Sequence, residues 1–195
     1  MSDDETLVLE PCDLFFTQGD AWLSRAIRLL QKPFWKSGER PQVNHVGGVV
    51  TSGTLELVEV IEALRKVVRH SLVGQYGPDS DAPGTRVEIW RPLNLTVEQK
   101  ALILKRATSY EGDVYGWTKI ALHVLDYPFD KTPVFRRLGR IDLLPFCSFV
   151  WARSFGEAEL HFGVEDYAAQ PDDMREFCRQ NPDKYELIRE LKPLG

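Results

Sequence analysis

The stretch HVGGVVTSGTLELVEVIE, residues 45–62, decides how this chain is interpreted. Its first six residues predict a β-strand and the next four a turn. The last eight predict a second strand, in which acidic or branched residues alternate with apolar ones. Gly47 and Gly48 remove side chains from the first strand, so that a packed helix or a substrate can approach its backbone closely. The stretch therefore predicts an antiparallel hairpin that begins with His45.

Strand pairing selects a partner for this histidine. With a two-residue turn at 52–53, Val60 lies opposite His45, and Glu62 is the diagonal neighbour of His45 on the same face. Diagonal Cβ atoms lie roughly 7–8 Å apart, within reach of a glutamate and an imidazole. Glu59 points to the other face, although a one-residue change in turn length would exchange the two glutamates. A carboxylate here would orient the imidazole and stabilise its charged form, whereas a solvent-facing glutamate is the ordinary alternative.

The rest of the chain indicates the fold class. We expect strands over 14–16, 67–73 and 85–91, and a loop over 74–84. We expect a helix that begins at Gly19–Asp20, one at Thr96 with Gln99 completing a capping box, and one over 114–124. Further helices should begin at Phe146 or Cys147, at Asp172 and at Pro182, the last reaching Leu191. This order predicts an α+β chain with a mainly antiparallel sheet packed against helices, and the length suits a single domain over 1–195.

Composition excludes several classes of function. The formal net charge is −5 and the sequence pI is about 5.4, so no broad basic surface for nucleic acid is expected. No apolar run approaches the roughly 20 residues of a membrane span. The acidic start, 1–5, does not resemble a signal peptide, which makes a cytoplasmic protein the default expectation. Three cysteines without paired spacing predict neither a disulfide framework nor a zinc site, and no cofactor is indicated.

One of the three cysteines has the setting of a nucleophile. A nucleophilic thiol needs a lowered pKa, a nearby base and donors for an oxyanion, and the amino end of a helix supplies the first and third. Cys147 follows Leu143–Pro145 and opens a predicted helix that closes at Gly156. A buried structural cysteine is the alternative. Cys12, beside a proline, and Cys178, inside a helix, are expected to be structural.

Five short motifs, taken in their order along the chain, resemble a known family, the circularly permuted NlpC-type papain-like cysteine hydrolases of the YiiX-like kind. They are Pro11-Cys12-Asp13-Leu14, His45-Val46-Gly47, Glu62-Ala63, Gly112-Asp113-Val114-Tyr115 and Cys147-Ser148. The similarity spans roughly residues 11 to 155. Each motif is short, and it is their order, with the cysteine after the histidine, that carries the resemblance.

The resemblance implies a permuted papain-like fold and a role for each matched residue. Cys147 would be the nucleophile, His45 its base and Glu62 the residue that orients the imidazole. Tyr115 and Ser148 would contact the substrate or the oxyanion, and a core aromatic beside Trp117 is the alternative reading of Tyr115.

The chain also departs from the family pattern. Cys12 stands where the opening motif has glycine, and Phe149 stands where a polar or acidic residue often follows the Cys-Ser pair. Insertions lie at 32–41 and 74–84, in the expected walls of the cleft.

Three functions remain in competition. The leading one is a thiol-dependent amidase or peptidase without a cofactor, with peptidoglycan peptides as the proposed substrate, in a phage enzyme or a secreted antibacterial effector. The second is a lipid acyl hydrolase or acyltransferase of the lecithin:retinol acyltransferase-like kind, whose site the apolar residues of 22–34 would line. The third is a non-catalytic binding module on the same scaffold. No immunity or delivery partner can be named from the sequence.

Overall fold

The computed structural model describes residues 7–19, 42–114 and 146–194. The helix expected after Gly19, the insertion at 32–41 and Tyr115 lie outside these residues. So does the helix expected over 114–124 except for its first residue, Val114, which forms an antiparallel bridge with Lys66 instead. In the described part, no helix is long and apolar enough to cross a membrane.

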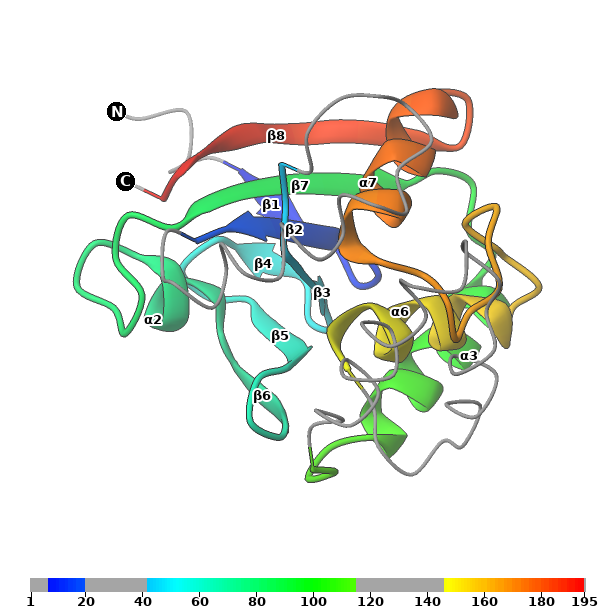
Figure 1. Cartoon of the computed structure of the whole chain (residues 1–195), viewed down its shortest axis with the longest axis horizontal. Helices are drawn as coiled ribbons and strands as arrows, with labels where there is room; N and C mark the ends of the chain where they lie inside the picture. The colour runs from blue at the N-terminus through cyan, green and yellow to red at the C-terminus, as the bar shows by residue number, and fades with distance from the viewer. Residues whose placement is uncertain (1–6, 20–41, 115–145, 195) are drawn as a thin grey trace, which may run out of the picture.

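A six-stranded antiparallel sheet forms the centre of the molecule, in the order β6-β5-β3-β2-β7-β8 (Figure 1). A small two-stranded sheet, β1-β4, lies beside it. The strands of the large sheet are β2 (Leu14–Gln18), β3 (His45–Val49), β5 (Glu59–Ala63), β6 (Val67–Ser71), β7 (Arg86–Pro92) and β8 (Tyr185–Pro193), and those of the small sheet are β1 (Val8–Leu9) and β4 (Gly53–Thr54).

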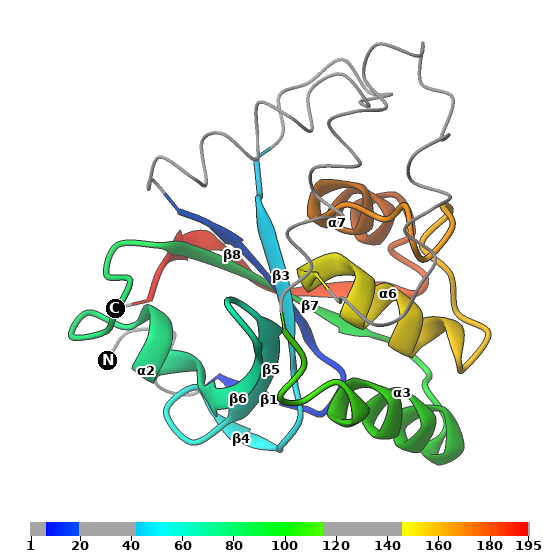
Figure 2. The ribbon, with the colours of Figure 1, turned by 60° about the horizontal axis from the view of Figure 1, so that its bottom comes forward.

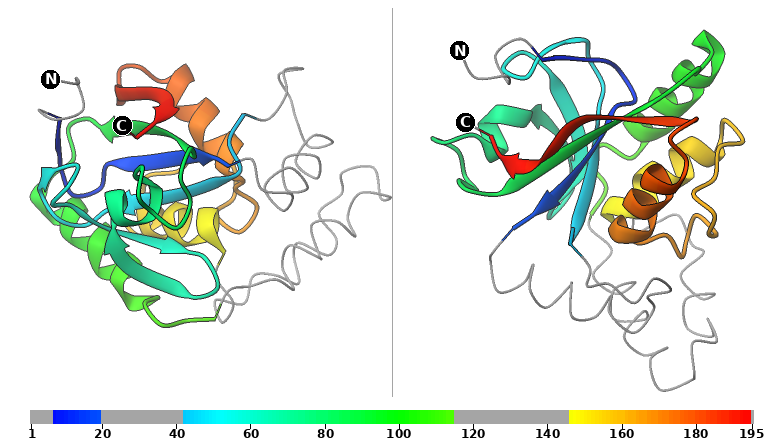
Figure 3. Two further views of the ribbon diagram at one scale, coloured as in Figure 1. Left: turned by 90° about the vertical axis from the view of Figure 1, so that its left-hand side faces the viewer. Right: turned by 90° about the horizontal axis from the view of Figure 1, so that it is seen from above.

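Helices cover the large sheet on both sides. The described helices are α2 (Leu72–Tyr76), α3 (Val97–Ser109), α6 (Cys147–Gly156) and α7 (Pro171–Gln180). Figure 2 and Figure 3 show α3, α6 and α7 on one side of the sheet and α2 on the other. The buried apolar residues fall into two matching clusters, because neighbouring side chains such as Phe15 and Phe16 enter opposite layers. The predicted α+β class with a mainly antiparallel sheet is confirmed.

Local sequence signals placed two helices correctly. The Thr96 side chain accepts a hydrogen bond from Gln99 N–H, and the Gln99 side chain returns to Thr96 N–H, which completes the predicted capping box of α3. Helix α6 begins at Cys147 and ends at Gly156, as predicted.

The hairpin between β3 and β5 has a longer connection than the two-residue turn that we predicted. Gly47 pairs with Glu62 and Val49 with Val60, so the predicted pairing of His45 with Val60 is wrong. Residues 53–54 leave the hairpin and pair with β1 instead, which lengthens the loop. The register moves by an even number of residues, and therefore the faces of the side chains do not change.

The C-terminal segment is a strand rather than the helix predicted over 182–191. Leucine, glutamate, arginine and lysine favour a helix locally, but tertiary contacts override that preference. Strand β8 pairs with β7, and Ile188 and Leu191 pack against opposite apolar clusters. Arg189 is buried and donates to the carbonyl groups of Val87 and Pro193, which ties the irregular end of this pair together.

The segment over 74–84 also differs from the prediction at its start. Ser71 caps the short helix α2 through a hydrogen bond from Gly74 N–H to its hydroxyl, and α2 continues to Tyr76 before the loop begins. This helix brings the buried Tyr76 against the sheet, which a plain loop would not do.

A buried ion pair fastens α7 to the sheet. Arg175 Nε and Nη2 donate to the two carboxylate oxygens of Glu88 on β7, at 2.8 and 2.7 Å. Trp90 Nε1 donates to the same carboxylate at 2.5 Å. The pair is almost fully shielded from solvent, so each partner depends on the other to remain buried in its charged form.

Candidate active site

Cys147 is the first residue of α6, and the helix is held in place by the strands beneath it. Trp151 Nε1, one turn after Cys147, donates to the carbonyl oxygen of Ile61 on β5 at 3.0 Å. The Trp151 ring lies over Gly48, where a Cβ atom would come within 2.4 Å of it. The close approach that the glycine predicted is therefore made by α6.

Backbone donors from the amino end of α6 and from β3 surround the thiol. The preceding residue, Phe146, is the N-cap and makes no side-chain cap hydrogen bond, so the cap supplies no side-chain acceptor to the first turn. Backbone N–H groups of Ser148 and Val46 reach the sulfur of Cys147. The Ser148 hydroxyl points elsewhere and donates to the Ala169 carbonyl at 2.7 Å. Ser148 thus contributes its backbone here, whereas its side chain anchors the helix.

His45 lies between Cys147 and Glu62. Its Nε2 atom contacts Glu62 Oε2, and its side chain also interacts with the thiol of Cys147. Because Nε2 is engaged by the carboxylate, Nδ1 is the nitrogen left to face the sulfur. Glu62 is completely buried, as expected for a residue that orients another group rather than binding solvent.

The three groups shift one another's protonation. Burial raises the pKa of the Cys147 thiol, but His45 and the nearby N–H groups outweigh it and leave the pKa below its usual value. Burial lowers the pKa of His45, but Cys147 and Glu62 outweigh it and raise that pKa to about 10. Burial raises the pKa of Glu62, whereas the neighbouring histidines lower it to about 2. This arrangement favours a thiolate, an imidazolium and a carboxylate side by side.

The other two cysteines have the opposite environment. Burial raises the pKa of Cys12 to about 12 and that of Cys178 well above its ordinary value. Cys12 also has φ of 78°, a left-handed conformation that favours glycine.

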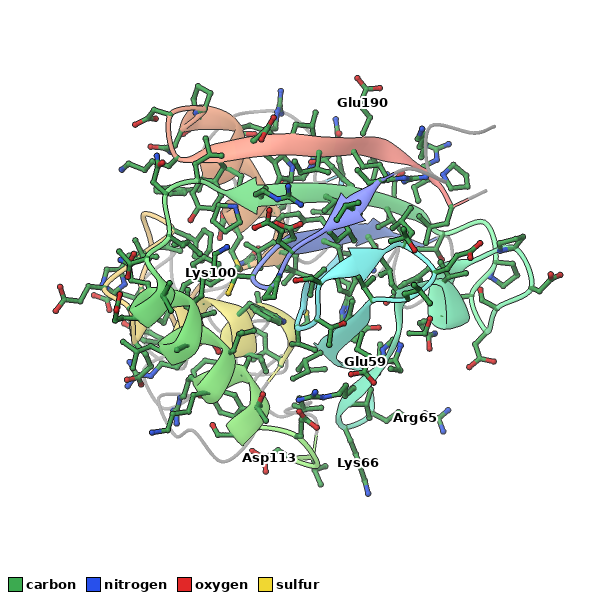
Figure 4. All side chains as sticks on the ribbon, turned by 180° about the vertical axis from the view of Figure 1, so that it is seen from behind. Glu59, Arg65, Lys66, Lys100, Asp113 and Glu190 are labelled. Carbon is green, nitrogen blue, oxygen red and sulfur yellow. The ribbon has the colours of Figure 1, made fainter. Side chains whose placement is uncertain are left out.

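Glu62, and not Glu59, lies on the same face of the sheet as His45, as the alternation of side chains along the strand predicted. Glu59 is exposed on β5, and its backbone N–H donates to Thr51 Oγ1. Figure 4 labels Glu59 on this strand, with Arg65 and Lys66 projecting from the turn that follows. Glu62, on the face of His45, is the residue that contacts it. Tyr115 lies outside the described residues.

Sequence reasoning missed two residues that contact the Glu62 carboxylate. Tyr76 donates its hydroxyl hydrogen to Oε2 at 2.5 Å, and His70 Nε2 lies 2.7 Å from Oε1. His70 could have been recognised from the alternation of side chains, because His70 pairs with Val60 and therefore lies on the same face of the sheet as Glu62. No local pattern marked Tyr76, which α2 carries to the site from a segment expected to be a loop.

Within the ranges that the structure describes, no group of three or more His, Cys, Asp and Glu side chains is arranged to hold a metal ion.

No family model matches the sequence, and no curated protein matches it. Among solved structures, the chain is similar to the metalloprotein YiiX from Escherichia coli O157:H7. The TM-score is 0.49 and the identity 16%, over 95% of this chain and 88% of the YiiX chain.

Proposed function

We propose that the protein is a thiol-dependent hydrolase of amide bonds on a permuted papain-like scaffold. One observation carries the proposal: a cysteine with a lowered pKa opens a helix beside a histidine whose far nitrogen contacts a buried carboxylate. Nucleophile, base and orienting residue in this order are the requirements of covalent acyl transfer. The roles are assigned to Cys147, His45 and Glu62.

The first half of the reaction forms an acyl-enzyme. The Cys147 thiolate attacks the carbonyl carbon, a sulfur–carbon bond forms, and the carbonyl electron pair moves to the oxygen. N–H groups at the amino end of α6 stabilise that oxyanion. The carbonyl re-forms as the carbon–nitrogen bond breaks, and the His45 imidazolium gives its proton to the leaving amine. The product is a thioester with His45 neutral.

The second half restores the enzyme. His45 takes a proton from water, and the oxygen of that water attacks the thioester carbon. The sulfur–carbon bond breaks, the acid is released, and the thiolate and imidazolium return. Glu62 stabilises the positive charge on His45 before and after the reaction without taking its proton.

Peptidoglycan peptides are the proposed substrate, cleaved by a phage enzyme or an exported antibacterial effector. Lipid esters are the competing substrate class, and the residues thought to favour them, 22–34, lie outside the described part of the chain.

The test exposes peptidoglycan and, separately, a lipid ester to the wild type, Cys147→Ala and the control Cys12→Ala. Amide cleavage that Cys147→Ala alone abolishes supports the proposal. If only the lipid ester is cleaved, the protein is a lipid acyl hydrolase and not an amidase. Full activity of Cys147→Ala would refute the mechanism.

Selective alkylation tests the nucleophile without a known substrate. At pH 6 we expect iodoacetamide to modify Cys147 faster than Cys12 or Cys178 in the folded protein, because only Cys147 has a lowered pKa. Peptide mass spectrometry identifies the modified residue. Equal rates at all three cysteines would favour a non-catalytic binding module.

A further inference from the structure

The Glu62 carboxylate is shared by two histidines. His45 and Tyr76 both meet Oε2, and His70 Nε2 lies 2.7 Å from Oε1. Glu62 is fully buried, whereas 22% of the His70 side chain is exposed. His70 therefore connects a buried carboxylate to solvent, and the proposed reaction assigns it no step.

The two contacts of His70 determine where its protons lie. Nδ1 is 3.0 Å from the carbonyl oxygen of Ser71, an atom that can only accept a hydrogen bond, so Nδ1 carries a hydrogen. Nε2 faces Glu62, an ionised carboxylate that also only accepts. A bare nitrogen lone pair 2.7 Å from a carboxylate oxygen would be repelled. Both nitrogens of His70 are therefore protonated in this arrangement, and the ring is a cation.

The charges of the cluster then balance. The Cys147 thiolate and Glu62 carry one negative charge each, and the imidazolium rings of His45 and His70 carry one positive charge each. With a neutral His70, the same buried cluster would keep one uncompensated negative charge, which is costly away from water. Burial opposes the charge on His70, but Glu62 outweighs it, and the pKa of His70 lies above its ordinary value.

We propose that His70 is a positioning residue, a cation that holds the second oxygen of Glu62 while His45 contacts the first, and that it makes the thiolate of Cys147 easier to form. This inference rests on the proposed function, since it concerns the same nucleophile. The titratable groups that act on His70 directly are Glu62 from β5 and His45 from β3. Tyr76 from α2 contacts the same carboxylate, and Cys147 from α6 interacts with His45.

The first experiment examines His70 in the wild type, so it does not depend on the folding of a variant. Nitrogen-15 NMR of the histidine side chains distinguishes a doubly protonated ring from a neutral tautomer, and His70→Gln assigns the signal. We expect His70 to be doubly protonated at pH 7.5, where an ordinary histidine is mostly neutral. A neutral His70 at pH 7.5 would overturn the inference.

The second experiment follows the rate of Cys147 alkylation against pH. Glutamine at position 70 keeps a polar side chain beside Oε1 but carries no charge. In His70→Gln the acid limb of the alkylation rate should therefore move to higher pH. The rate on that limb should fall about tenfold. His161→Gln is the matched control, because the exposed His161 also contacts a carboxylate, Asp166, at 3.3 Å. It should leave the profile unchanged.

The outcomes separate the two proposals. An unmoved profile in His70→Gln, or an equal shift in His161→Gln, would refute the role of His70 while Cys147 remains the nucleophile. If wild-type Cys147 reacts no faster than Cys12, the proposed function fails. The NMR result for His70 then still decides whether its ring is a cation.

Discussion

Replacing Gly48 with alanine should displace α6 and separate Cys147 from His45. The new Cβ atom would lie 2.4 Å from the Trp151 ring, whereas carbon atoms pack at about 3.5 Å or more. The ring, and the helix that carries it, would have to move by about 1 Å. Overpacking of this kind costs about 1–3 kcal/mol of unfolding free energy, and a 1 Å displacement at a reactive site costs on the order of 10²-fold in rate.

The assay combines chemical denaturation with the rate of Cys147 alkylation at pH 6. Gly53→Ala is the control, since its Cβ atom would find its nearest neighbour, Leu57 Cβ, at 3.4 Å, an ordinary contact. Trp151→Phe removes the atoms that clash, so the cost of Gly48→Ala should be smaller in that background. An equal cost in both backgrounds, or unchanged alkylation in Gly48→Ala, would refute the account of how α6 is positioned.

Three further predictions concern buried charges. Glu62→Gln should slow Cys147 alkylation at pH 6 by about 10²-fold or more because the imidazolium loses its anion, whereas the exposed Glu59→Gln should not. The folded pKa of Glu62 is about 2 against an ordinary 4.5. The contribution of ionised Glu62 to folding stability should therefore be complete above about pH 4.5 and disappear as the pH falls toward 2. In denaturation experiments, the midpoints of the wild type and of Glu62→Gln should then converge at low pH. Arg175→Met should lower the unfolding free energy by about 3–5 kcal/mol, because Glu88 stays buried without its cationic partner. Adding Glu88→Gln to this variant should recover part of the lost stability. If the two substitutions instead gave additive losses, this account of the ion pair would be wrong.

Parts of the site that depend on local chemistry could be predicted. The start of α6 at Cys147 follows from a proline-bounded stretch and a closing glycine, and the choice of Glu62 over Glu59 follows from strand alternation. The second prediction held although its turn was wrong, because a register shift by an even number of residues preserves the faces. The catalytic roles of these residues remain predictions.

Other parts required contacts that are distant in sequence. Residues 182–191 have helix-forming side chains, and only the free edge of β7 makes them a strand. Tyr76 approaches Glu62 because α2 folds back over the sheet, which composition alone did not reveal.

The sequence by itself determined the α+β class, the helix that opens at Cys147 and the face that His45 shares with Glu62. Hydrogen-bond caps and side-chain periodicity act over a few residues, so they can be recognised along the chain. Only the tertiary structure decided that Trp151 lies over Gly48, that β8 closes the sheet, and that a second histidine and a tyrosine meet the same carboxylate. These contacts arise from the order of strands in the sheet and from packing between its layers, and neither is encoded within a short segment.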